Sequence, residues 1–480
     1  RVRNEGPGAT KARPYNGRPG LPCHLIGSRA TTRDRPYTGT GHFVPALHIR
    51  NGLHYGWPMS LFIAFCRLLL AGIFWVVVRL FWGIEIHGLE HAKRDHPVYF
   101  AMLHKRDLDP LIEAPTVLAR HRWRSLAGDV QFALRGDAFL PGFLGIMVRR
   151  PRWLSRFLRI LSLGTVLRAL GFSPLENLYI LPTEMWIREW LAVRGDANAG
   201  EVLTPAFLAH IAAMSDEELC SLQACPLSHL LTWHYHDTLQ PWSTASIFTE
   251  VARPHARQAA LKKLKQELDD LSSWLARGKH VWGAPEGQLS ADGTIHSITS
   301  IPYRLLQKSP PETDVMPISI SYDFMTTRRT RVFVNLAPAI EQAPSLSARA
   351  LETRLHAAWR LSTYFTCTQL ASGFLVQKLD ATNPVFALDD LVAHLYDQAV
   401  QLVRAGRYVD RRLLSPRKVR KLAKRFLRYV QRHHMIKPAW PQKWIPAITD
   451  LSMEVRPGDV GYRDAPLAYA WNELQDLLKV

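Results

Sequence analysis

Short strand-like runs alternate with helical stretches through the middle of this chain, and this alternation constrains the fold more than any other feature. Runs with the length and pattern of strands occupy residues 83–90, 97–103, 280–283, 314–322 and 330–336. An amphipathic helix over residues 256–277 leads into the third of these runs, and Gly278 is placed to end it. Strands separated by helices build α/β folds. The sequence therefore predicts an α/β domain, with a mixed sheet flanked by helices, over residues 83–345.

The chain is long enough for two or three domains, and it carries a large positive charge. Its 480 residues include 60 Lys and Arg against 41 Asp and Glu, which gives a formal net charge of +19. This balance favours anionic partners, namely a phosphorylated substrate, anionic lipid headgroups or nucleic acid. No nucleic-acid recognition module accompanies the basic residues, so nucleic acid is not an expected partner. Five scattered cysteines indicate a reducing compartment.

Residues 56–82 contain the strongest membrane signal in the sequence. The lead before them, residues 1–55, is rich in Arg, Gly and Pro, and we expect it to be disordered. The segment itself is nearly all apolar but contains Arg67 and Arg79. An Arg at the centre of a spanning helix costs roughly 2.5 to 3.5 kcal/mol, so an interfacial or re-entrant helix is favoured over a span. A buried core helix is the remaining alternative.

Two other regions are predicted to be helical. Residues 151–255 form a helical insertion within the α/β domain, and residues 346–480 form a basic C-terminal helical region. Within the C-terminal region, a basic helix over residues 416–436 places four apolar residues on one face: Val419, Leu422, Phe426 and Val430. This pattern is typical of a membrane-surface or anion-binding helix, and it fits a docked helix with a solvated basic face equally well.

The helical insertion also contains a cluster of cysteines and histidines. Its members are Cys220, Cys225, His229, His234 and His236. Their spacing matches no standard structural zinc site, and both residue types are common in packed helices. No metal is therefore expected.

A histidine at the end of the second predicted strand is the leading catalytic candidate. In His104-Lys-Arg-Asp-Leu-Asp109 the carboxylate follows the histidine by five residues across a strand-to-helix turn. A carboxylate beside an imidazole fixes its tautomer and stabilises the imidazolium, so the other ring nitrogen can take a proton from an attacking hydroxyl. The spacing alone is weak, because a chance Asp at this offset is unsurprising among 20 histidines. An ordinary loop histidine is the alternative.

Four ordered segments resemble the sequence blocks of the glycerolipid acyltransferase family, which includes the glycerol-3-phosphate and 1-acylglycerol-3-phosphate acyltransferases. Residues 84–110, which contain His104 and Asp109, are similar to the first block. Residues 134–150 resemble the second, residues 284–290 (Ala-Pro-Glu-Gly-Gln-Leu-Ser) the third and residues 315–319 the fourth. Together the four segments extend over most of residues 83–340, and their order is far more specific than any one of them.

The resemblance implies a reaction and its participants. It implies direct transfer of a fatty acyl group from acyl-CoA or acyl carrier protein to a glycerolipid precursor, glycerol-3-phosphate or 1-acylglycerol-3-phosphate, in phospholipid biosynthesis. It implies no cofactor, no metal and no covalent enzyme intermediate. The expected setting is an anionic membrane surface on the cytoplasmic face, in keeping with the basic and apolar segments above.

The resemblance also assigns roles to residues. His104 is expected to be the general base, and Asp109 is expected to orient it. Arg150 falls on the family's phosphate-contacting arginine, since a guanidinium matches phosphate oxygens bidentately. The remaining residues expected to contribute to substrate binding are Arg149, Glu286, Gly287, Ser290 and Pro317.

Two positions depart from the family pattern. Leu103 stands where most relatives have Asn, and Leu289 stands where most have a second phosphate-contacting Arg. Arg149, Arg304 and Lys105 are candidate replacements for the missing cation. Acylation of a non-phosphorylated lipid alcohol or amine therefore stays open, as does a membrane-surface binding protein that has kept the scaffold without turnover.

Overall fold

The structure is a computed structural model that describes part of the chain. The described residues are 65, 69, 72–73, 75–76, 78–92, 96–106, 109, 112, 130–139, 164–169, 171–175, 181–215, 217–239, 242–287, 289–327, 329–440, 443–447 and 465–479. All of them belong to one compact unit, Tyr55–Val480. The predicted N-terminal lead, most of the apolar segment 56–82, and both Arg149 and Arg150 lie outside the described residues.

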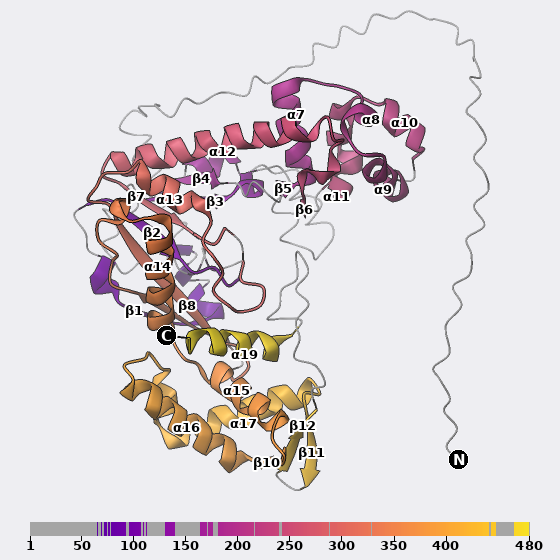
Figure 1. The fold of residues 1–480 in the computed structure, drawn as a ribbon. Helices are drawn as coiled ribbons and strands as arrows, with labels where there is room; N and C mark the ends of the chain where they lie inside the picture. Colours follow the sequence, from indigo (N-terminus) through magenta and orange to yellow (C-terminus); the bar gives the residue numbers. More distant parts are fainter. Residues whose placement is uncertain are drawn as a thin grey trace, which may run out of the picture. The chain divides into compact units, whose positions relative to one another are not determined.

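A seven-stranded sheet organises the described fold (Figure 1). Its strands, in spatial order, are β1 (Gly83–His87), β9 (Arg331–Leu336), β8 (Asp314–Asp323), β2 (Val98–Met102), β7 (His280–Gly283), β3 (Val130–Arg135) and β4 (Phe172–Leu175). The strands from β8 to β4 are parallel, while β9 is antiparallel to β8 and parallel to β1. The predicted mixed sheet is confirmed. Five of these strands were predicted from the sequence, and β3 and β4 were not.

Strand β2 shows how the two faces of the sheet are buried. Side chains alternate along a strand, so Val98, Phe100 and Met102 enter one apolar core while Tyr99, Ala101 and Leu103 enter the other. The second core is covered by the helices α12 (Arg253–Ala276), α13 (Ser300–Gln307) and α14 (Ala348–Ser362). A strand that is buried on both faces has a continuous run of apolar residues, and this is why β2 could be predicted from the sequence.

The insertion folds around an apolar core of its own. The α-helices around this core, within residues 181–239, are α7 (Thr183–Arg194), α8 (Ala199–Val202), α9 (Pro205–Ser215), α10 (Leu219–Ala224) and α11 (His236–Leu239). The long helix α12 contacts α7 in this core and contacts β4 and β7 of the sheet (Figure 1). One continuous helix therefore connects the insertion to the sheet that carries His104.

Beyond α14, the C-terminal region contains four described α-helices and a small sheet. The helices are α15 (Cys367–Leu379), α16 (Leu388–Arg404), α17 (Pro416–Arg432) and α19 (Pro466–Leu477). The sheet has the order β10 (Phe386–Ala387), β12 (Lys443–Pro446) and β11 (Ile436–Trp440), and the sequence analysis did not predict it. The four apolar residues predicted on one face of α17 are buried in this region's core, so α17 is a docked helix with an exposed basic face.

Candidate active site

His104 lies directly beyond the carboxyl end of β2, a central strand of the sheet. The backbone N–H of Leu103 donates to the carbonyl of Ile318 in β8 at 2.9 Å, which extends the β2–β8 pairing to the residue before His104. Leu103 itself is fully buried in the apolar core. Leu103, which stands in place of the expected Asn, therefore fills part of the core. The rigid strand fixes the start of the segment that carries His104.

The side chains of His104 and Asp109 face each other. His104 Nδ1 lies 3.4 Å from Asp109 Oδ2, which is ion-pair distance, and no described atom completes a hydrogen bond to this nitrogen. The Asp109 side chain is 0% exposed and the imidazole 19%. Catalytic hydrogen bonds are often long in the absence of substrate. The arrangement orients the ring with Nδ1 toward the carboxylate, while part of the ring is open to solvent.

Neutral donors hold the Asp109 carboxylate. Oδ2 accepts from the backbone N–H groups of Lys105 at 2.5 Å and Arg106 at 2.6 Å, and Oδ1 accepts from the hydroxyl of Tyr322. The Arg106 guanidinium carbon lies over the Tyr322 ring, 3.9 Å from its centroid, and 4.8 Å from that of Phe324. These contacts fix the loop from 104 to 109 against the end of β8.

The loop after β7 flanks the backbone of His104 on both sides. Glu286 Oε2 accepts from the His104 N–H at 3.4 Å, while the Ser290 N–H donates to the His104 carbonyl at 2.9 Å. Strand β7 pairs with β2. This pairing places the segment after β7, which was matched to the third block, beside the His104 segment of the first block. The structure thus brings together two segments that are about 180 residues apart in the sequence.

Glu286 is a buried carboxyl with a perturbed titration. Burial raises its pKa to about 7, although the N–H groups of His296 and His104 and the nearby His charges act in the opposite direction. Its Oε1 accepts from the His296 N–H at 2.8 Å. Both carboxyl oxygens are therefore occupied by backbone donors within the fold.

Three other predicted site residues, Gly287, Ser290 and Pro317, have structural roles in the fold. Gly287 has φ +69°, and a Cβ there would lie 2.9 Å from Thr299 Cγ2, so the turn itself requires glycine. The Ser290 hydroxyl donates to the Thr294 carbonyl at 2.7 Å and the residue is 1% exposed. Pro317 is buried in β8, opposite Ala101 of β2.

The C-terminal helix α19 packs against this site, which the sequence analysis missed. Lys105, only 2% exposed, forms an ion pair with Glu473 of α19. Asp476 Oδ2 accepts from the Ile295 N–H at 3.0 Å. Lys105 is therefore occupied inside the fold, which argues against it as the replacement phosphate cation. No local signal links residues 368 positions apart, so the contact was not predictable from spacing.

Two members of the predicted cysteine and histidine cluster, Cys225 and His234, have protein partners. Within the described residues, no group of three or more His, Cys, Asp or Glu side chains is arranged to hold an ion. The Cys225 thiol instead donates to the Leu222 carbonyl at 3.2 Å, and His234 pairs with Glu217 at 3.1 Å.

No protein-family model matches this chain, and no curated protein matches it. Among solved structures, the crystal structure of the 1-acyl-sn-glycerophosphate (LPA) acyltransferase PlsC from Thermotoga maritima is similar at 13% sequence identity. The match covers 63% of this chain and 84% of that chain, with a TM-score of 0.30. A TM-score this low does not establish a common fold, so functional inference depends on the geometry of the site. Fold and site together define an α/β protein in which a partly exposed histidine faces a buried aspartate at the carboxyl end of a central strand.

Proposed function

We propose that the chain is an acyltransferase of the glycerolipid type, in which His104 is the general base. The observation that carries this proposal is the fully buried Asp109 carboxylate, 3.4 Å from Nδ1 of a partly exposed imidazole. A carboxylate in this position favours the tautomer with the proton on Nδ1 and leaves Nε2 to accept a proton. An ordinary loop histidine has no need of a buried carboxylate fixed by three separate donors.

The proposed reaction is a direct acyl transfer. The acceptor hydroxyl gives its proton to His104 Nε2 while its oxygen attacks the thioester carbonyl carbon. The tetrahedral intermediate then breaks its C–S bond, and the imidazolium returns the proton to the departing sulfur, which leaves as a thiol. Asp109 stabilises the transient imidazolium, and the buried Glu286 adds a second carboxyl nearby.

The proposed donor is acyl-CoA or acyl carrier protein, and the proposed acceptor is glycerol-3-phosphate or 1-acylglycerol-3-phosphate. This finer assignment is supported by the resemblance of the four sequence blocks, with Arg150 and Arg149 as the proposed phosphate contacts. Leu289 favours the second candidate, acyl transfer to a non-phosphorylated lipid alcohol or amine, because it removes one expected cation.

An acceptor panel tests this proposal. Purified protein would be given radiolabelled acyl-CoA or acyl carrier protein with glycerol-3-phosphate, 1-acylglycerol-3-phosphate, a diacylglycerol and a long-chain amine. We expect one acceptor to be labelled, His104→Ala to abolish the labelling, and His210→Ala, an exposed histidine on α9, to retain it. Absence of labelling with every donor and acceptor would show that the chain is not an acyltransferase for these substrates.

We also propose that residues around 65–81 attach the protein to the cytoplasmic face of an anionic membrane. The described residues of this segment are helical. Val78 is buried against the sheet, while five large apolar side chains are exposed at helical spacing: Phe65, Leu69, Ile73, Val76 and Leu80. Such a face suits the interface of a bilayer. No helix in the described residues has both the length and the apolar content to span a membrane.

Vesicle flotation tests the attachment. The pair Ile73→Glu and Leu80→Glu should release the protein from vesicles that contain anionic lipid, because charged side chains oppose burial among acyl chains. Val166→Glu alters an equally exposed apolar residue on α6 (Gly164–Ala169), outside this segment, and should leave binding intact. Equal binding by the Ile73/Leu80 variant and wild type would rule out this segment as the anchor.

A further inference from the structure

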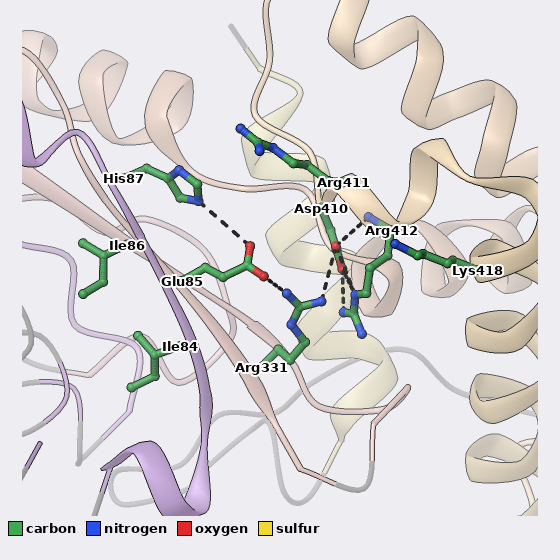
Figure 2. Close-up of a pocket in the computed structure, with 9 residues that line it drawn as sticks. All are labelled: Ile84, Glu85, Ile86, His87, Arg331, Asp410, Arg411, Arg412 and Lys418. Atoms are coloured by element: carbon green, nitrogen blue, oxygen red, sulfur yellow. Dashed lines mark hydrogen bonds and ion pairs between the residues drawn. The ribbon is translucent and has the colours of Figure 1, made fainter. Parts of the chain in front are cut away.

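A second charged site lies between one edge of the sheet and the C-terminal helices. It is a cavity of about 590 Å³ whose lining residues are distinct from those around His104 (Figure 2). The lining residues are Ile84, Glu85, Ile86, His87, Arg331, Asp410, Arg411, Arg412 and Lys418. Four of these side chains are Arg or Lys and two are carboxylates, so the cavity has a surplus of positive charge.

Ion pairs neutralise the inner part of the cavity. Asp410, 1% exposed, accepts from Arg412 Nη2 at 2.5 Å and lies 3.7 Å from Arg331 Nη1. Arg331 also pairs with Glu85 (Figure 2). Arg412 pairs with the buried Asp323 at 2.6 Å. Each carboxylate on this side of the cavity already faces a guanidinium group. We call the paired arginines, Arg331 and Arg412, the wall of the cavity, because these ion pairs hold them in place.

Arg411 and Lys418 form the part of the cavity that is not neutralised. Both side chains are exposed, and neither has an ion pair with any described residue. Figure 2 shows the pairs among the other lining residues, with no dashed line at either of these two. Both cations are therefore available to a ligand that enters the cavity.

The beginning of α17 adds to the positive potential. A helix N-terminus carries a partial positive charge, which favours acidic side chains in the first turn. The first turn of α17 has no acidic residue and contains Arg417 and Lys418, and its N-cap Ser415 makes no side-chain cap. In the same cavity, burial lowers the pKa of the Arg331 guanidinium and the charge of Arg412 acts in the same direction, while Asp410 opposes both.

We propose that this cavity binds a phosphate group, as a phosphomonoester or pyrophosphate, through Arg411 and Lys418. Arginine presents a planar fork to phosphate oxygens, and lysine supplies a point charge. Arg411 and Lys418 line the same cavity as Arg331 and Arg412, whose ion pairs hold them in place. This binding site goes beyond the acyl transfer proposed above and does not depend on it. A lipid headgroup and a soluble phosphate compound present the same chemistry.

Calorimetric titration of the full chain with pyrophosphate, at constant ionic strength, tests the site. Arg411→Gln combined with Lys418→Gln should weaken binding at least about tenfold, since two charge-assisted contacts are removed. Lys421→Gln combined with Arg432→Gln makes the same change in charge at exposed α17 positions outside the cavity, and should stay within about twofold of wild type. Equal weakening in the two double variants, or no saturable binding by wild type, would overturn the proposal.

Vesicles separate the two sources of phosphate. Phosphatidylcholine vesicles with and without phosphatidic acid would be compared with soluble pyrophosphate, using the same two double variants. A selective loss of phosphatidic acid binding in the Arg411/Lys418 variant identifies a lipid headgroup as the ligand, and a selective loss of soluble phosphate binding identifies a free compound. If that variant binds every phosphate source as wild type does, the cavity is only a junction of ion pairs.

Discussion

Asp109 and Asp410 are both buried carboxylates, but they are held by different partners. Asp109 accepts hydrogen bonds from two backbone N–H groups and from the Tyr322 hydroxyl, all of them neutral. Asp410 faces the guanidinium groups of Arg412 and Arg331, which are both cationic. The two carboxylates are 0% and 1% exposed, so burial does not distinguish them.

The difference in partners gives the two carboxylates different uses. Neutral donors leave the negative charge of Asp109 available to a neighbouring imidazolium, which is what a general base requires. The charge of Asp410 is paired with the guanidinium groups of Arg412 and Arg331. The residues that line the surrounding cavity carry a net positive charge. One carboxylate can support proton transfer, while the other stabilises a cationic wall suited to an anion.

The largest expected effect is the loss of activity in Asp109→Asn. The amide keeps the shape of the carboxylate, and its oxygen can still accept from the N–H groups of Lys105 and Arg106. It has no charge to stabilise the imidazolium, so we expect the rate of acyl transfer to fall about a thousandfold. The initial rate with the labelled acceptor measures this effect. Asp397→Asn, an exposed site on α16, is the matched control, and equal rates for the two variants would exclude a role for the Asp109 charge.

Asp410→Asn should instead lower stability. It leaves Arg331 and Arg412 without a carboxylate that both contact, and breaking a buried pair costs about 3 kcal/mol in the free energy of unfolding. Urea denaturation measures the change. Asp389→Asn breaks the exposed pair with Arg420 and should leave the midpoint almost unchanged. A midpoint for Asp410→Asn equal to wild type would mean that the wall does not need this carboxylate.

Glu286→Gln should flatten the dependence of stability on pH. Burial raises the pKa of Glu286 from its model-peptide value of 4.5 to about 7, so the folded chain binds a proton that the unfolded chain releases between these values. Its contribution to stability is full below pH 4.5 and is lost as the pH rises through 7, by about 2 kcal/mol between pH 5 and pH 7.

Urea midpoints at the two pH values measure this contribution. The slope in Glu286→Gln should be shallower than in wild type by that amount, because glutamine does not titrate. Glu312→Gln, at an exposed position, should keep the wild-type slope. An unchanged slope in Glu286→Gln would show that this carboxyl titrates normally in the fold.

The smallest expected effect is that of Tyr322→Phe. It removes one of three hydrogen bonds to Asp109 and keeps the ring under the Arg106 guanidinium. We expect a loss of about 1 kcal/mol, seen as roughly a fivefold lower rate with the acceptor KM unchanged. A loss as large as that of Asp109→Asn would instead place the hydroxyl in contact with substrate.

The sequence predicted those parts of the fold that have strong local patterns. Strand β8 is buried along all ten residues and was readable as an apolar run, and α12 begins at Arg253 and ends at Ala276, close to the predicted 256–277. Strand β4 contains a serine and a proline among four half-buried residues, so it had no clear strand pattern. Local pattern therefore located the buried elements and missed the weakly patterned ones.

The contacts of the candidate site also fall into two groups, those that a local pattern predicts and those that it does not. The pairing of His104 with Asp109 spans five positions, and its placement at the end of β2 followed from the strand pattern. The partners of this loop from β8 and α19, Tyr322 and Glu473, depend on tertiary packing across more than 200 positions. Spacing and local propensity contain no information about such contacts.

Chemical rescue tests whether the His104 imidazole is the base of an acyl transfer. The rate of His104→Ala would be measured with labelled acyl donor and acceptor while free imidazole is added over a range of pH. We predict a loss of at least about a hundredfold without imidazole, and a partial recovery that follows the neutral imidazole concentration. A His104→Ala protein that transfers acyl groups at the wild-type rate would contradict the account.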